Sequence, residues 1–232
     1  MSRNPKFYFS LRSPYSWMAY RDLLDRYPDV AEAVEWVPFF EPDELSERML
    51  AERGEEFPYS AMSRAKHFYI LQDVGRLTKA RGLPLTWPVD RAPVWEVPHL
   101  GYLVAERNGK GPEYIAAVYR ARWELGLNIC DPAVIADVAT SLGLDPVEVS
   151  TAATSPDLRL AGVEVLLRIC KDGVFGVPFF VHRFSRFWGM DRLDEFAAHL
   201  RSKLAPAGAL PATASSVSVG RSSEESHAGG CG

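Results

Sequence analysis

Residues 6–17, KFYFSLRSPYSW, contain the strand-to-helix junction from which the fold is predicted. The aromatic run at 7–9 is typical of a short strand. Ser13 follows with a hydroxyl that can cap a helix, and Pro14 suits the first helical position. Apolar side chains then recur at helical spacing as far as Tyr27, so the sequence predicts a strand that runs directly into a helix.

Further strands are expected on either side of a long central region. VEWVPFF at 34–40 predicts a second strand, and its proline favours an edge position or a bulge. Strand, helix and strand in quick succession predict a βαβ unit with a parallel pair. PFFVHRF at 178–184 predicts a strand that continues into FSRFWG, and a final helix is expected from about Asp191.

The middle of the chain is predicted to be mostly helical, because strand signals are few between residues 42 and 170. We therefore expect an α/β protein whose core comes from residues 1–45 and 171–204. Residues 46–170 would form a large all-helical insertion. The low-complexity segment 205–232 is expected to be disordered.

Two irregular stretches interrupt the helical region, ERGEEFPYS at 52–60 and GLPLTWPVDRAPVWEVP at 82–98. Both are rich in proline and aromatic residues. Loops of this composition often line a pocket, and a role as packed connectors is equally compatible with it.

Composition excludes several classes of function. The 232 residues carry a net charge of −4, with 47% hydrophobic and 24% charged residues, which is ordinary for a globular protein. This charge gives no electrostatic basis for binding nucleic acid or an anionic membrane. No apolar run is long enough for a signal peptide or a membrane span, so we expect a cytoplasmic protein.

Cysteine and histidine offer little chemistry. Three cysteines are too few and too scattered for a disulfide framework or a four-ligand zinc site, and the five histidines show no metal spacing. Cys130 and Cys170 are expected to be buried, and Cys231 lies in the tail with nothing to lower its pKa. His67 and His99 could assist proton transfer, although a structural or surface role is favoured for each.

Three short motifs remain as candidates for a site. Ser13 begins a helix, where free N–H groups and a partial positive charge would stabilise an anion such as a thiolate. Val177-Pro178 enters a strand and could form a cis peptide that exposes the Val177 backbone to a ligand. Asp191 could bind an ammonium group of a ligand. The alternatives are a plain helix cap for Ser13 and for Asp191, and a trans proline at the start of the strand.

Taken together, FYFSLRSPYSW, VFGVPFF and FWGMDRL resemble the 2-hydroxychromene-2-carboxylate isomerases and kappa-class glutathione transferases. These families belong to the DsbA-related thioredoxin superfamily, and the resemblance covers residues 6 to about 203. It implies a thioredoxin-like fold with an all-helical insertion. It also implies a homodimer, since relatives are often dimers.

The resemblance also implies a role for each matching position. Ser13 matches the active-site serine that orients a bound glutathione thiolate, and Ser16 takes the place of the second cysteine of a redox CxxC. Val177 and cis-Pro178 match the pair that holds the cysteinyl part of the cofactor. Asp191 matches the acid that binds the γ-glutamyl ammonium. Lys66 falls where the family's lysine contacts the cofactor.

Some positions depart from the family pattern. Met190 stands where a polar residue would contact the cofactor's carboxylate, and Ser10 stands where aspartate is frequent. Glutathione, another small thiol such as mycothiol, and a mechanism without a thiol all stay open. Without a CxxC, dithiol–disulfide exchange at this site is excluded.

We therefore expect a cis–trans isomerase that acts on a small conjugated or aromatic alkene by reversible thiol addition, with Ser13 as the catalytic residue. The cofactor-binding set would be Lys66, Val177, Pro178, Met190 and Asp191. A glutathione transferase or peroxidase would use the same activated thiol and release the adduct. A catalytically inactive thioredoxin-like binding module is the alternative from another class.

Overall fold

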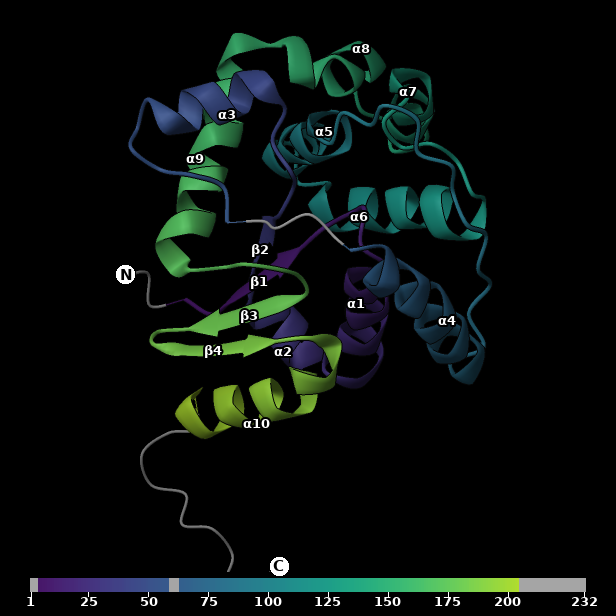
Figure 1. Ribbon diagram of the computed structural model, residues 1–232, viewed down its shortest axis with the longest axis vertical. Coiled ribbons are helices and arrows are strands. Elements are labelled where there is room, and N and C mark those ends of the chain that lie inside the picture. The colour runs from purple at the N-terminus through teal and green to yellow at the C-terminus, as the bar shows by residue number, and fades with distance from the viewer. Residues whose placement is uncertain (1–3, 59–62, 205–232) are drawn as a thin grey trace, which may run out of the picture.

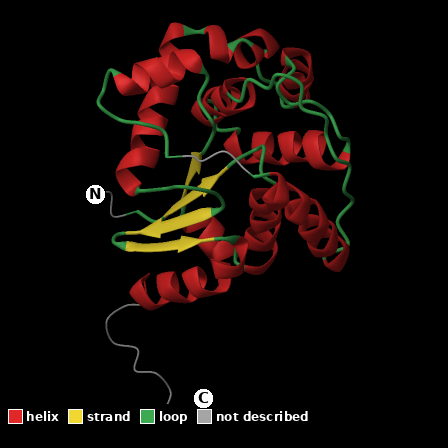
Figure 2. Cartoon of the chain, in the orientation of Figure 1, coloured by secondary structure: helices red, strands yellow, loops and turns green. Residues whose placement is uncertain are grey.

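The computed structural model describes residues 4–58 and 63–204, so the segment 205–232 and its expected disorder lie outside the described residues. Four strands form one mixed sheet in the order β2-β1-β3-β4 (Figures 1 and 2). The central strand β1 (Lys6–Phe9) pairs parallel with β2 (Glu35–Pro38) and antiparallel with β3 (Phe179–His182). The last strand, β4 (Ser185–Trp188), pairs antiparallel with β3 and forms the other edge.

The two inner strands are buried along their whole length because their side chains are mostly aromatic. Phe7 on β1 stacks on Phe180 of β3 at 4.8 Å between ring centroids, and Phe180 stacks on Phe196 at 4.9 Å. The one charge on β1, Lys6, is paired with Asp172 at 2.6 Å, which offsets the cost of its burial. The inner strands thus differ from the edge strands in being buried along their whole length. Pro38 lies on the edge strand β2, as predicted.

Helices α1 (Pro14–Arg26), α2 (Pro28–Ala33) and α10 (Leu193–Leu204) flank the sheet (Figure 1). Ion pairs join them side by side: Arg26 on α1 with Asp194 on α10, and Arg201 on α10 with Asp29 on α2. The separate helix α2 was not predicted. It arises because Pro28 cannot continue α1 but suits the first turn of a new helix.

Between β2 and β3 the described part of the chain contains helices and no strand, which confirms the predicted fold class. Most of these helices gather above the sheet, while α4 lies beside α1 (Figure 1). They are α3 (Glu44–Ala51), α4 (Arg64–Ala80), α5 (Glu96–Arg107), α6 (Gly111–Tyr119), the π-helical turn η1 (Arg120–Glu124), α7 (Pro132–Ser141), α8 (Pro146–Ser150), the 3₁₀ turn η2 (Ala152–Thr154) and α9 (Pro156–Asp172). Among the described helices, none is both long enough and apolar enough to cross a bilayer.

The C-terminal part of the sheet is a hairpin rather than one long strand. Arg183 adopts a positive φ of 57°, which turns the chain between β3 and β4. A 3₁₀ turn, η3 (Met190–Arg192), then precedes α10, so the final helix begins two residues later than expected.

Candidate functional site

Ser13 lies in the connection between β1 and α1, and it is the N-cap of that helix. Its Oγ accepts a hydrogen bond from the Ser16 N–H at 3.2 Å, so the cap interpretation is confirmed. This bond uses an acceptor site of the oxygen and leaves the hydroxyl proton free to be donated. In the same turn, the Tyr15 N–H has no acceptor among the described residues. The start of α1 therefore presents two donors that could face an anion.

Ser16 has a structural role at the start of α1. It is fully buried, and its Oγ accepts a hydrogen bond from the Ser10 N–H at 3.2 Å. The position that would hold the second cysteine of a CxxC thus ties α1 back to the end of β1.

The loop that leads into β3 meets the start of α1. The Val177–Pro178 peptide is cis, as the resemblance implies, and Pro178 O accepts a hydrogen bond from Gly189 N at 3.0 Å. Within the described part of the chain, no protein group hydrogen-bonds the Val177 N–H or C=O. A half-buried backbone edge without partners is able to pair with the backbone or an amide of a ligand.

Two adjoining cavities meet at these loops. The first, here named the serine cavity, has a volume of about 230 Å³ and is lined by Ser10, Arg12, Ser13, Pro14, Tyr15, Phe39, Glu41, Lys66, Ile70, Trp95, Phe175, Gly176, Val177 and Trp188. The second, here named the arginine–aspartate cavity, has a volume of about 640 Å³ and is lined by Tyr15, Asp22, Arg26, Asp73, Leu77, Arg81, Val177, Pro178, Trp188, Gly189, Met190, Asp191, Arg192 and Asp194. Tyr15, Val177 and Trp188 belong to both, so a ligand could extend from one cavity into the other.

The six predicted site residues are divided between these cavities. Ser13 and the exposed Lys66 line the serine cavity, whereas Pro178, Met190 and Asp191 line the arginine–aspartate cavity. Val177 connects the two groups. Lys66 therefore lines a cavity together with Ser13 and not with Asp191.

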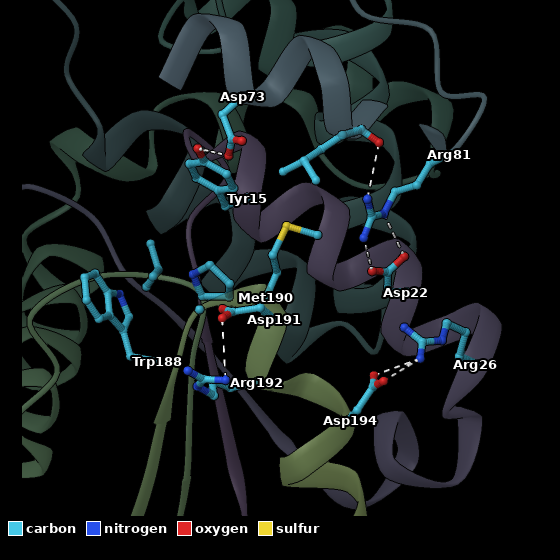
Figure 3. Close-up of a pocket in the computed structure, with 14 residues that line it drawn as sticks. Tyr15, Asp22, Arg26, Asp73, Arg81, Trp188, Met190, Asp191, Arg192 and Asp194 are labelled. Atoms are coloured by element: carbon cyan, nitrogen blue, oxygen red, sulfur yellow. Dashed lines mark hydrogen bonds and ion pairs between the residues drawn. The ribbon is translucent and has the colours of Figure 1, made fainter. Parts of the chain in front are cut away.

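Figure 3 shows the carboxylate of Asp191 beside Arg192, with Met190 pointing between Tyr15 and the Asp22–Arg81 pair. The Asp191 side chain is 71% exposed and lies 3.6 Å from the Arg192 guanidinium. In the described residues it makes no cap hydrogen bond, so it remains available to a ligand. Gly189 has a φ of 106°, and a Cβ there would approach the Asp191 carboxylate to 2.4 Å, so glycine permits this close turn.

The walls of the arginine–aspartate cavity are held by pairs of opposite charge. Arg81, the C-cap of α4, binds the two carboxylate oxygens of Asp22 on α1 through Nε and Nη2 at 3.1 and 2.9 Å (Figure 3). Arg26 binds both oxygens of Asp194 through Nη2 alone, at 2.8 and 2.9 Å. Above them, the Tyr15 hydroxyl donates to Asp73 at 2.8 Å. Burial and this hydrogen bond raise the pKa of Tyr15 well above its usual value, so the phenol stays neutral.

Three residues that the sequence did not single out shape the serine cavity. Arg12 forms an ion pair with Glu41, and its guanidinium carbon lies 5.1 Å from the ring centroid of Trp95. Trp95 comes from the proline-rich stretch at 82–98, which composition had marked as a possible pocket wall. Arg12 and Glu41 carry no local signal, because they meet only in the folded chain.

The remaining candidates from the sequence are structural. His99 is completely buried: its Nε2 accepts from the Leu11 N–H at 3.0 Å, and its Nδ1 lies 2.7 Å from Trp95 O. Burial lowers the pKa of His99 to about 3, so it stays neutral and supports the loop. Cys130 and Cys170 are only partly buried, which corrects the expectation that they are buried. Burial raises the pKa of the Cys130 thiol to about 12, which keeps it unreactive.

Comparison with known proteins agrees with this architecture. The family model of the DSBA-like thioredoxin domain matches residues 6–201. The 2-hydroxychromene-2-carboxylate isomerase of Sphingobium xenophagum is 27% identical over 205 residues, which cover 86% of this chain and 99% of that protein.

Solved structures show the same fold. A structure of 2-hydroxychromene-2-carboxylate isomerase superposes with a TM-score of 0.66 at 22% identity, covering 86% of this chain and 97% of that one. The cytosolic disulfide reductase DsbM from Pseudomonas aeruginosa, solved with GSH, gives a TM-score of 0.57 at 18% identity and covers 86% of this chain and 98% of that one. The resemblance noted in the sequence is thereby confirmed, and the chain belongs to the DSBA-like thioredoxin domain family.

Proposed function

We propose that this protein is a cis–trans isomerase of a small conjugated alkene, and that it works with a bound low-molecular-weight thiol next to Ser13. The observation that carries the proposal is the junction of two features. Ser13, whose hydroxyl proton is free to be donated, caps α1, and the same cavity is lined by Val177, whose backbone has no hydrogen-bond partner among the described residues. The similarity to an isomerase over most of both chains supports the reaction class.

The residues present fit a thiol. The Val177 N–H and C=O can pair with the amide groups next to a cysteinyl sulfur, and the Asp191 carboxylate can accept from a positively charged or hydroxyl-bearing end. When bound, the thiol supplies a nucleophile that adds reversibly to the conjugated system and so permits rotation about the former double bond. Met190 offers only a thioether, so the choice between glutathione and another small thiol is left to experiment.

The protein's own groups would stabilise negative charge. The Ser13 hydroxyl and the N-terminus of α1 can donate hydrogen bonds to an anion, and donors placed in advance of the reaction need no reorganisation. Lys66 adds a cation on the same side of the serine cavity. Trp95, Phe175 and Trp188 give that cavity aromatic walls, which suit a flat conjugated substrate.

The first test is thermal unfolding with and without reduced glutathione, with mycothiol in parallel. A thiol at 100 times its dissociation constant should stabilise the fold by about 2.7 kcal/mol. Stabilisation by neither thiol would overturn thiol dependence. Stabilisation without turnover would indicate a binding module.

The second test is turnover of 2-hydroxychromene-2-carboxylate by Ser13→Ala, measured by absorbance. Loss of a donor to the reacting anion should lower kcat by about 10²- to 10³-fold. Ser155→Ala is the matched control, because Ser155 caps α9 through the Leu158 N–H and also precedes a proline. If both variants keep the same turnover, Ser13 is only a helix cap.

Product analysis separates isomerisation from transfer. An isomerase returns the thiol unchanged, whereas a transferase releases a thioether that mass spectrometry detects. The cytoplasmic location expected from the sequence belongs to the same proposal. So does the homodimer that the resemblance implies, and light scattering tests the dimer.

A further inference from the structure

The loop that joins β1 to α1, residues 10–13 and here named the serine loop, is held by the helical insertion. Backbone atoms of three consecutive loop residues hydrogen-bond to insertion side chains: Ser10 O accepts from the Tyr119 hydroxyl at 3.1 Å, the Leu11 N–H donates to His99 Nε2 at 3.0 Å, and Arg12 O accepts from Arg122 Nε at 3.2 Å. The Arg122 contact is closest to Ser13 in the chain, and it is the one made by a charged group.

Arg122 has little freedom to do anything else. It lies on the π-helical turn η1, and its side chain is only 3% exposed. Its two terminal nitrogens bind both carboxylate oxygens of Asp90 at 2.9 and 2.8 Å. The guanidinium carbon also lies 4.8 Å from the Trp123 ring centroid and 5.1 Å from that of Trp95. With the fork fixed in this way, Nε is left to face the loop.

The contact acts on the peptide group that immediately precedes Ser13. Its C=O, on Arg12, accepts from Arg122, and its N–H, on Ser13, donates to Ser10 O at 3.1 Å. Both polar atoms of this peptide are therefore engaged, which sets the plane of the peptide and the direction from which the chain enters α1. The position of the Ser13 hydroxyl depends on that direction.

We propose that Arg122, oriented by Asp90, is a positioning residue that fixes the serine loop for the reaction at Ser13. Its effect on turnover rests on the function proposed above, whereas its effect on the loop does not. Two readouts, amide exchange and turnover, keep the failure of one idea distinct from the failure of the other.

The test compares Arg122→Lys with Arg159→Lys. Arg159 on α9 is also nearly buried, at 12% exposure, and it combines a two-oxygen contact to Asp43 with hydrogen bonds to a backbone carbonyl, Ala153 O. None of the residues that Arg159 contacts lines the serine cavity or the arginine–aspartate cavity. Lysine keeps the charge in both variants but has no planar fork, so it cannot serve the carboxylate and the carbonyl together.

Amide hydrogen exchange of residues 10–17 is the readout that needs no activity. We expect Arg122→Lys to accelerate it by about tenfold or more, because the loop opens more often when this contact is lost. Arg159→Lys should leave it unchanged. Equal protection of the loop in Arg122→Lys and in the unmodified protein would overturn the proposal, whatever the enzyme does.

Turnover gives the second readout. Arg122→Lys should lower kcat by about 10- to 100-fold through misplacement of Ser13, with a smaller change in KM for the thiol. In a Ser13→Ala background the same substitution should cost almost nothing, because there is no hydroxyl left to misplace. Additive losses in the double variant would contradict positioning through Ser13. Faster exchange in a protein with no turnover and no thiol binding would keep the loop role and remove the proposed function.

Discussion

The two loops that meet at the cavities are built in opposite ways. In the serine loop, 10–13, the backbone is held by Ser16, His99, Tyr119 and Arg122. In the cis-proline loop, 175–178, the Val177 N–H and C=O have no protein partner within the described residues. Both loops precede regular elements of the same small core, so the contrast is not a matter of position in the fold.

The contrast indicates that the two loops are suited to different roles. A group that stabilises developing charge gains from being fixed before the reaction, since no energy is then spent on orienting it. A group that binds a ligand needs free hydrogen-bonding capacity, which the ligand completes. The serine loop meets the first requirement, and the cis-proline loop meets the second.

The largest effect should come from removing a support of the serine loop. His99→Leu leaves the buried Leu11 N–H without an acceptor, so we expect the free energy of unfolding at pH 7 to fall by about 2 kcal/mol. Denaturant unfolding measures it.

The pH dependence makes this prediction sharper. In the folded protein burial holds the pKa of His99 at about 3, whereas in the unfolded chain it is near 6.5. As the pH falls below about 6.5, only the unfolded state takes up the proton, so the unmodified protein loses up to about 1.4 kcal/mol of stability per pH unit. His99→Leu lacks this loss, and the two proteins should reach similar stability near pH 5. Parallel pH curves would show that His99 is not the neutral acceptor.

The next effect concerns the cis-proline loop. A saturating thiol should slow amide exchange around residues 175–177 by about tenfold, because it supplies the missing partner of the Val177 N–H. Exchange at 10–13 should change much less, since that loop is already bonded. Mass spectrometry of peptides from both loops, with the oxidised disulfide of the same thiol as control, measures the difference. Equal protection of both loops would remove the contrast.

A smaller effect is expected at Asp191. Because its carboxylate is largely exposed and faces Arg192, Asp191→Asn should weaken thiol binding by about three- to fivefold for a thiol with an ammonium group. A neutral, hydroxyl-bearing thiol should bind almost equally to both proteins. Titration calorimetry with glutathione and mycothiol distinguishes them. An unchanged affinity for both would exclude Asp191 from the site.

The smallest effect should follow Arg26→Gln. This arginine pairs with Asp194 at the solvent edge of the arginine–aspartate cavity, so its loss should cost only about 0.5 kcal/mol of stability. Thermal unfolding at low and high salt checks the expectation. A loss of thiol binding in this variant would extend the binding surface to the end of α1.

Sequence reasoning reached the elements whose signals are local. Aromatic runs predicted β1 and β3, and Ser13-Pro14 predicted the start of α1, because capping and strand propensity act over a few residues. It did not reach two of the supports of the serine loop. Tyr119 and Arg122 meet residues that lie 109 and 110 positions earlier in the chain, and such contacts have no periodic signature.

The supports of the serine loop limit how this protein could be shortened by protein engineering. A scaffold reduced to the four strands and their flanking helices would keep strand pairing, the helix cap and the cis-proline loop. It would lose every side chain that the insertion lends to Ser10, Leu11 and Arg12. The insertion therefore cannot be removed without loss of these contacts. Transplanting the serine motif alone into another thioredoxin-like scaffold would transfer Ser13 but not the contacts that position it.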